Sequence, residues 1–340
     1  MESVAQPTLD GRDTASGLRR LEPLRTSYSQ ASAESLLAEN DVLAVIGFGA
    51  RAALVDDPRC LRVGLEPMRE RAPFEVWRGR GPVQYGRDGE LAWACNQDYA
   101  FGSIELAEAD HDGIAETARR AYEMLKAWCR ASSTPHLLRM WNYLDAINQG
   151  HGDDERYRQF CSGRAAGMGD DFASIYPAAT AIGVRDGRRV VQVFWLAASE
   201  PGIPVENPRQ ISAWRYPRRY GPAAPGFARG MRAPTRRPQL FISGTAAVVG
   251  HASHHDNDSA AQLAETLINL DSLMTAAQVD LESHYCRDSI WKAYVRNAAD
   301  ADCVQPLLHA RFGAQTPLLL LHGDICRAEL LVEIDGVYCG

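Results

Sequence analysis

The sequence predicts an α+β fold of two similar units, in which mixed β-sheets pack against long helices. Two stretches, near residues 111–130 and 259–278, repeat apolar residues at helical spacing, and short segments rich in β-branched and aromatic residues surround both. The length of 340 residues also exceeds the usual size of one domain. We therefore expect a flexible leader over residues 1–29, an N-terminal domain over residues 30–150 and a C-terminal domain over residues 151–340.

The elements of the N-terminal half follow from its apolar pattern. Short apolar or β-rich runs predict strands, and the helix is predicted because its apolar residues recur at intervals of four and three positions. These residues are Ile114, Ala118, Ala121, Leu125 and Trp128. The predicted strands cover residues 42–47, 74–77, 91–95, 101–106 and 137–143, with the helix at 111–130 before the last of them.

The C-terminal half repeats this arrangement. Residues 176–184 and 189–197 are expected to pair as a hairpin around a turn at Arg185-Asp186-Gly187, and a loop rich in Pro, Gly and Arg follows over residues 200–238. The helix at 259–278 begins with Ser259 and Gln262 at the spacing of a capping box. Further strands are expected at residues 239–249, 291–296, 317–321 and 329–334, and a short helix at residues 301–311.

The composition narrows the choice of partners. A formal net charge of −7 disfavours nucleic acid or an anionic membrane, and no apolar run approaches the ~20 residues of a membrane helix. The N-terminal stretch lacks the apolar core of a signal peptide, and the eight cysteines are scattered without a CxxC pair, so a cytoplasmic protein is expected. All basic residues except Lys126 and Lys292 are arginines, which bind carboxylates in a bidentate manner.

Two motifs suggest cofactors, and both have a simpler explanation. Gly47-Phe48-Gly49 follows an apolar strand like the start of a dinucleotide fingerprint, but its third glycine is missing and no helix is predicted after it. His251, His254, His255 and Asp256 could ligate a metal, although such residues are also common in the loop that precedes a helix. A tight turn and a structural or gating loop are the favoured interpretations. No GxSxG nucleophile motif is present.

The segment from Asp324 to Gly336 contains the best candidate for acid catalysis. Because side chains alternate along a strand, Glu333 is expected to point away from the face that carries Val332 and Ile334. A carboxyl group in this position is either a solvated edge residue or, beside arginines, a general acid.

Several segments together resemble the chorismatases, which belong to the RidA (YjgF) superfamily and carry two RidA-like (chorismate-mutase-like) domains. The similarity extends from about residue 40 to the C-terminus. The segments are Leu138-Arg139-Met140-Trp141-Asn142-Tyr143, Phe160-Cys161-Ser162-Gly163-Arg164, Tyr176-Pro177-Ala178-Ala179-Thr180, Phe227-Ala228-Arg229, Ser243-Gly244-Thr245-Ala246, Ala293-Tyr294-Val295-Arg296 and Asp324 to Gly336.

The resemblance implies roles for individual residues. Glu333 matches the acid that protonates the enolpyruvyl methylene of chorismate, and Cys326 matches a position where cysteine accompanies formation of 3-hydroxybenzoate and alanine accompanies hydrolysis to a dihydrodiol. Arg139 and Arg296 match arginines that bind the substrate carboxylates. The remaining candidates for the substrate pocket are Ser243 and Gly244 at its floor, with Arg164, Tyr176 and Arg229. An imine deaminase is disfavoured because Asp324 stands where deaminases of this superfamily carry an arginine.

The implied reaction converts chorismate to 3-hydroxybenzoate and pyruvate without net water, cofactor or metal. Three alternatives stay open at this point: 4-hydroxybenzoate as a further product, hydrolysis to the dihydrodiol, and a RidA-like protein that binds a ligand without turnover. A metal-dependent enzyme built on the loop from His251 to Asp256 is a further rival. RidA relatives also suggest a homo-trimer.

Overall fold

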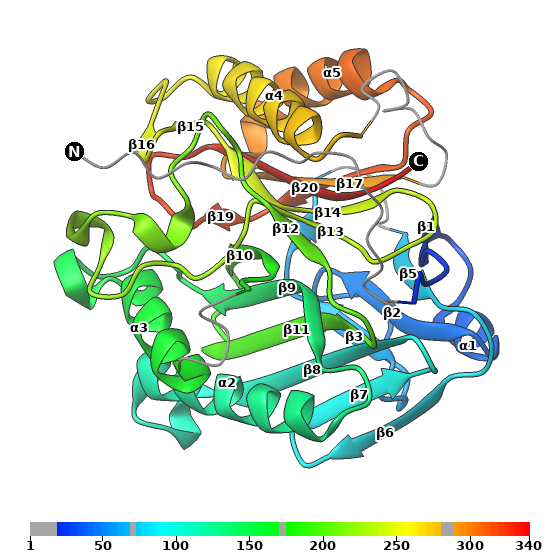
Figure 1. The fold of residues 1–340 in the computed structure, drawn as a ribbon. Helices are drawn as coiled ribbons and strands as arrows, with labels where there is room; N and C mark the ends of the chain where they lie inside the picture. Colours follow the sequence, from blue (N-terminus) through cyan, green and yellow to red (C-terminus); the bar gives the residue numbers. More distant parts are fainter. Residues whose placement is uncertain (1–18, 69–72, 170–174, 280–288) are drawn as a thin grey trace, which may run out of the picture.

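This computed structural model describes residues 19–68, 73–169, 175–279 and 289–340, and the statements below apply to them. Two seven-stranded sheets pack face to face, with two helices on the outer face of each, and a four-stranded sheet lies beside them (Figure 1). The predicted α+β class, with mixed sheets packed against long helices, is confirmed. Each helix in this part of the chain is too short or too polar to cross a bilayer.

The first large sheet has the strand order β19-β10-β9-β11-β8-β7-β6, and helices α2 and α3 cover its outer face. Alternation along the strands divides the apolar residues between two layers: Met140 and Trp195 face the helices, whereas Trp141 and Phe194 face the second sheet. Its elements are β6 (Gln84–Asp88), β7 (Leu91–Cys95), β8 (Tyr99–Ala107), α2 (Gly113–Ala131), β9 (His136–Asp145), α3 (Arg156–Met168), β10 (Ala178–Val184), β11 (Val190–Ala198) and β19 (Asp324–Ile325).

The second large sheet has the order β12-β13-β14-β20-β17-β18-β4, with α4 and α5 on its outer face. Val332 and Ile334 point toward these helices, and Phe241 and Tyr294 point toward the first sheet. Its elements are β4 (Glu66–Pro67), β12 (Ile203–Val205), β13 (Gly230–Arg232), β14 (Gln239–Ala246), α4 (Ser259–Ala276), β17 (Ile290–Val295), α5 (Ala301–Phe312), β18 (Leu318–His322) and β20 (Val332–Cys339).

The two large sheets have the same topology. The order β6-β7-β8-β11-β9-β10 corresponds strand by strand to β12-β13-β14-β20-β17-β18, and only the pairs β9–β10 and β17–β18 are parallel within these two sets. The helices also occupy equivalent places along the chain. In the first unit α2 follows β8 and α3 follows β9, and in the second unit α4 follows β14 and α5 follows β17. Each sheet ends on a strand from the other half of the chain, because β19 pairs with β10 and β4 pairs with β18. The chain therefore contains a structural repeat.

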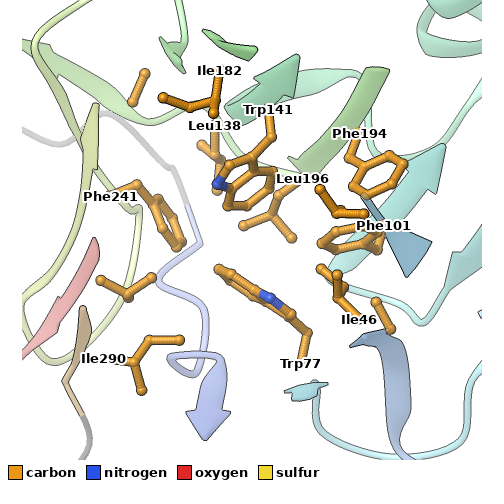
Figure 2. Packing of buried hydrophobic residues seen from close by; sticks show 14 of the residues in the cluster. Ile46, Trp77, Phe101, Leu138, Trp141, Ile182, Phe194, Leu196, Phe241 and Ile290 are labelled. Carbon is orange, nitrogen blue, oxygen red and sulfur yellow. The ribbon is translucent and has the colours of Figure 1, made fainter. Parts of the chain in front are cut away.

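A smaller sheet in the order β1-β5-β2-β3 closes one end of the layer between the large sheets. Trp77 from this sheet packs edge-on against Trp141 at 5.4 Å between ring centroids, and Phe101 and Phe241 complete the aromatic cluster (Figure 2). The remaining elements are β1 (Arg25–Ser29), α1 (Ala33–Leu37), β2 (Val42–Phe48), β3 (Cys60–Val63), β5 (Phe74–Arg78), β15 (Val248–Val249) and β16 (Ala252–Ser253).

The expected hairpin of residues 176–184 and 189–197 does not form. Instead β9 lies between β10 and β11, and β10 runs parallel to β9. Both strands thus complete the first sheet rather than begin a second one. The strand pairing favours a domain boundary within residues 199–202, and we propose it in place of the predicted boundary near residue 150.

Two other local expectations differ from the structure. The described part of the expected leader is packed, because Leu21 and Leu24 are buried and β1 pairs with β5; residues 1–18 lie outside the described residues. The N-cap of α4 is Asp258 rather than Ser259, and Gln262 instead hydrogen-bonds to backbone groups near the start of β20. Gly47-Phe48-Gly49 lies at the end of β2 and is followed by a turn, which is the interpretation that the sequence favoured.

Candidate active site

A cavity of about 490 Å³ opens between the two repeated units. Its walls come from the loop after β9, the start of α3, the long loop between β12 and β13, strand β14 and the segment that leads into β20. Four arginines and three glutamates line it: Arg158, Arg219, Arg229, Arg327, Glu155, Glu329 and Glu333. The cavity can therefore bind an anion, and Glu333 is the acidic residue buried deepest in its wall.

Glu333 is held in the wall by its position in β20. Its neighbours Val332 and Ile334 are buried against α4 and α5, so the Glu333 side chain points to the other face of the sheet, as the sequence predicted. The side chain is 4% exposed, and the described part of the chain donates no hydrogen bond to its carboxyl group. Burial, with the nearby Asp335 charge, raises the pKa of Glu333 to about 8 despite three arginines that act in the opposite direction. The carboxyl group is therefore protonated at neutral pH.

Gly244 allows this close packing of Glu333. It lies in an irregular part of the pairing between β14 and β20, and its backbone N–H donates to Thr180 Oγ1 at 3.0 Å. A Cβ atom at this position would collide with Glu333 Oε1. Gly244 thus lies at the cavity floor, where the sequence analysis expected it.

Cys326 and Arg229 also line the cavity, as expected. Burial and the proximity of Glu333 raise the pKa of the Cys326 thiol, which is therefore neutral at ordinary pH. One guanidinium nitrogen of Arg229 donates to the Ile211 carbonyl at 2.8 Å and to the Tyr216 hydroxyl at 2.7 Å. These bonds fix Arg229 beneath the loop that forms the cavity wall.

Arg139 lies outside the cavity and forms a buried ion pair. Its Nη2 donates to Asp335 Oδ2 at 2.8 Å and to Thr180 Oγ1 at 2.5 Å, and both members of the pair are 1% exposed. Lys292 extends this network by pairing with Glu75 at 2.8 Å. The charge of Arg139 is therefore paired inside the protein, and its side chain does not line the cavity, where we expected it.

Arg296 is likewise occupied by the protein. Its guanidinium group donates to three backbone carbonyls, at Leu330, Ile325 and Arg327, and to the side chains of Asn148 and Asp324. These contacts hold in place the segment that carries Cys326.

Ser243 and Tyr176 do not line the cavity either. The Ser243 hydroxyl donates to the Ala228 carbonyl and accepts a hydrogen bond from Ala179 N, so it joins three segments of backbone. Tyr176 stacks on Trp214 at 5.3 Å between centroids. Arg164 lines a smaller space behind Glu333 and Cys326. The structure therefore brings together Glu333, Cys326, Gly244, Arg229 and Arg164, and places Arg139, Arg296, Ser243 and Tyr176 elsewhere.

The sequence analysis missed three arginines of the cavity, Arg158, Arg219 and Arg327. Arg327 lies over the rings of Tyr220 at 4.2 Å and Tyr216 at 5.0 Å, and it donates to the His251 carbonyl. The only available signal was the density of arginine and tyrosine in the loop 215–220 and the position of Arg327 next to Cys326.

The histidines of the loop before α4 have separate partners. His251 Nδ1 hydrogen-bonds to Arg219, and His255 Nε2 lies 3.1 Å from Glu265. Within the described residues, no group of three or more His, Cys, Asp or Glu side chains is arranged to hold a metal ion. His251 and the neighbouring Ser253 instead help to fix Arg327.

Comparison with known proteins gives consistent matches. The family described as "Chorismatase FkbO/Hyg5-like, N-terminal" matches residues 75–197. A chorismatase of Streptomyces hygroscopicus is 34% identical over 91% of this chain and 93% of its own length. A 3-hydroxybenzoate synthase of the same organism is 32% identical over 78% of this chain and 81% of its own length.

The fold comparison agrees. A crystal structure of a chorismatase superposes with a TM-score of 0.79 at 32% identity, covering 94% of this chain and 99% of that one. The matches that cover more than nine-tenths of this chain extend across both repeated units. With this identity over nearly the whole length, the chain belongs to the chorismatase family.

Proposed function

We propose that this protein cleaves chorismate to 3-hydroxybenzoate and pyruvate by general-acid catalysis. The observation that carries the proposal is the Glu333 carboxyl group, which is buried in the wall of an arginine-lined cavity and has a pKa of about 8. The kinship with a chorismatase and a 3-hydroxybenzoate synthase supports the choice of substrate and product.

The first step needs an acid that is neutral when the substrate enters. Chorismate carries two carboxylates and an enol ether, and the terminal methylene carbon of that ether accepts a proton. Transfer of the Glu333 proton to this carbon forms the methyl group of pyruvate and leaves an oxocarbenium ion. The resulting Glu333 carboxylate then stabilises the cation electrostatically, because little water competes in a buried site.

The substrate carboxylates are best matched by cavity arginines. Arg158, Arg219, Arg229 and Arg327 line the cavity, whereas Arg139 and Arg296 are bound to protein groups. Guanidinium groups bind carboxylates through paired, charge-assisted hydrogen bonds. We therefore propose these cavity arginines as the substrate clamp. Of these, Arg229 lowers the pKa of Glu333, but burial and the Asp335 charge outweigh this effect, so Glu333 keeps its proton.

Formation of 3-hydroxybenzoate requires that the ring hydroxyl, rather than water, completes the reaction. The hydroxyl oxygen attacks the ring carbon that bears the ether, that carbon–oxygen bond breaks, and pyruvate leaves. The hydroxyl proton passes to the Glu333 carboxylate, and the resulting epoxide opens by breaking the bond between its oxygen and the carbon that first carried the hydroxyl. Loss of a ring proton and protonation of that oxygen give the aromatic product, so the atoms of chorismate equal those of the two products. Cys326, which is neutral and weakly polar, is proposed to keep water from the oxocarbenium ion.

The direct test is incubation of the purified protein with chorismate, followed by chromatography of the aromatic product and of pyruvate. We expect equal amounts of 3-hydroxybenzoate and pyruvate, and in heavy water the pyruvate methyl group should gain a single deuterium. A dihydrodiol as main product would assign the chain to the hydrolysing branch. Ligand binding without any product would favour a non-catalytic protein instead.

Two further points belong to this proposal. The free thiols of Cys60, Cys129 and Cys161 are consistent with the reducing cytoplasm in which we place the enzyme. The homo-trimer stays a prediction.

A further inference from the structure

A second, much smaller space adjoins the main cavity. Its volume is about 30 Å³, and Glu333, Cys326, Gly244, Tyr157 and Phe227 line both this chamber and the main cavity. The two spaces therefore adjoin at these five residues. A chamber of this size accommodates one or two water molecules but no larger ligand.

The chamber has an unusual polar lining. Arg164 is 4% exposed, and one of its terminal nitrogens donates to the Gly226 carbonyl at 2.5 Å. Its Nε atom is buried and has no hydrogen-bond partner in the described part of the chain. Leaving such a donor unpaired in the interior is costly, and buried water commonly satisfies groups of this kind.

Glu333 offers the complementary group. It lines the chamber and accepts no hydrogen bond from the described residues, so both of its oxygens can bond to water. Asn142 and Thr180 also line the chamber, although Asn142 already bonds to Tyr122 and to the Thr180 carbonyl. A buried water needs two to four polar partners, and the Arg164 and Glu333 side chains supply at least two.

We propose that this chamber is a water site in which one or two ordered molecules bridge Arg164 and Glu333, with Cys326 separating them from the substrate. The role of Cys326 rests on the proposed chorismate cleavage, whereas the water site itself does not. Arg164 is then a positioning residue that acts through the water and makes no contact with the substrate.

Removal of the Cys326 side chain should let the proposed water act as a nucleophile. In the Cys326→Ala variant, the water oxygen bonds to the oxocarbenium carbon, and one water proton returns to the Glu333 carboxylate. The hemiketal then collapses: the bond from that carbon to the ether oxygen breaks, the ring oxygen takes the hydroxyl proton, and pyruvate leaves. The products are the dihydrodiol and pyruvate, and one water molecule is consumed.

The first test is a high-resolution crystal structure of the full chain. We expect one or two waters within hydrogen-bond distance of Arg164 Nε and the Glu333 carboxyl group. A dry chamber, or a water bonded to neither group, would overturn the proposal. This result does not depend on the substrate, so it stands apart from a failure of the proposed function, which would appear as wild-type protein that makes no product from chorismate.

The second test fills the chamber. Ala181 lies on β10 in the chamber wall and is only partly buried, so Ala181→Val can project two methyl groups into the space. In the Cys326→Ala background this change should lower the ratio of dihydrodiol to 3-hydroxybenzoate by about tenfold, which corresponds to about 1.4 kcal/mol between the two competing barriers. The same substitution at Ala92 on β7, which lines neither space, is the matched control and should leave the ratio unchanged.

The outcomes separate cleanly. An undiminished dihydrodiol ratio in a folded Cys326→Ala/Ala181→Val protein would mean that the attacking water comes from the main cavity, and the proposal would fall. Absence of dihydrodiol from Cys326→Ala alone would remove Cys326 as the barrier. Melting temperatures of all variants identify any that do not fold, and the crystallographic test then decides.

Discussion

Two carboxyl groups on the same face of β20 have opposite surroundings. Asp335 accepts hydrogen bonds from Arg139, Tyr294 and Thr180 at 2.8 to 2.9 Å. Glu333, two residues earlier, is buried to a similar degree but receives no hydrogen bond from the described chain. Burial alone therefore does not distinguish a structural carboxylate from a catalytic acid. The difference is whether the protein supplies partners for the ionised form.

The network around Asp335 also explains the state of Glu333. Arg139 and Lys292 oppose Asp335 and Glu75, so the formal charges of this cluster cancel. Asp335 nevertheless lies near Glu333 and, after burial, is the main charge that raises its pKa. Glu333 therefore lies between the buried ionic cluster around Asp335 and the arginine-lined cavity.

The largest expected effect of the contrast between Glu333 and Asp335 is the loss of activity when Glu333 can no longer donate a proton. We expect Glu333→Gln to lower kcat by roughly 10²–10⁴-fold, the usual contribution of a general acid, while the melting temperature does not fall. Steady-state kinetics with chorismate measure this. Glu329→Gln, which changes an exposed glutamate at the same cavity, should keep most of the activity. Equal losses in the two variants would refute the special role of Glu333.

Removing the charge of Asp335 should instead damage stability. In Asp335→Asn, Arg139 and Lys292 keep only Glu75 as a buried counter-charge, and breaking a buried pair costs about 3–5 kcal/mol of unfolding free energy. Chemical denaturation measures the loss. Asp153→Asn, which breaks an exposed pair with Arg218, is the control and should barely move the midpoint. A stable Asp335→Asn protein would contradict the structural role assigned to the cluster.

Loss of an arginine that lines the cavity should weaken substrate binding. Arg327→Gln removes a guanidinium group that lines the cavity over Tyr220. We expect KM for chorismate to rise by about 10- to 100-fold, because a hydrogen bond to a charged group contributes about 1.5–3 kcal/mol. Arg218→Gln changes a nearby arginine that does not line the cavity and serves as the control. An unchanged KM in Arg327→Gln would remove Arg327 from the proposed clamp.

The pH dependence of stability also depends on the surroundings of Glu333. The pKa of Glu333 is higher in the folded chain, at about 8, than its ordinary value of 4.5, so the folded state binds the proton more tightly. Unfolding free energy should therefore fall as pH rises through this window, by up to about 1.4 kcal/mol per pH unit from this group. Denaturation of wild type and Glu333→Gln at several pH values tests this. A wild-type slope equal to that of the variant would indicate an ordinary pKa.

The fold class was predictable from sequence because both long helices have clear apolar periodicity. The predicted hairpin of residues 176–184 and 189–197 was wrong, since β10 joins β9 by a parallel pairing across α3, and the domain boundary at residues 199–202 that we propose follows from this pairing. Non-local pairing of this kind leaves no mark in a short window of sequence.

The candidate site was predictable only in part, for a related reason. Alternation in the last strand placed Glu333 correctly on the inner face, and the resemblance to chorismatases identified Gly244, Cys326 and Arg229 near it. The position of Arg139 outside the cavity could not be predicted, because sequence gives the charge of a side chain but not its partner, here Asp335 almost 200 residues later. Arg158 and Arg219 come from a helix start and an irregular loop, whose positions follow from tertiary structure alone.

The proton on Glu333 can be observed directly by infrared difference spectroscopy of wild type against Glu333→Gln. At pH 6.5 we expect a protonated carboxyl band that is absent from the variant and disappears from wild type as the pH rises above about 8. The loss of kcat at alkaline pH should follow the same titration. An ionised Glu333 at pH 6.5, in a protein that still converts chorismate, would contradict general-acid catalysis by this residue.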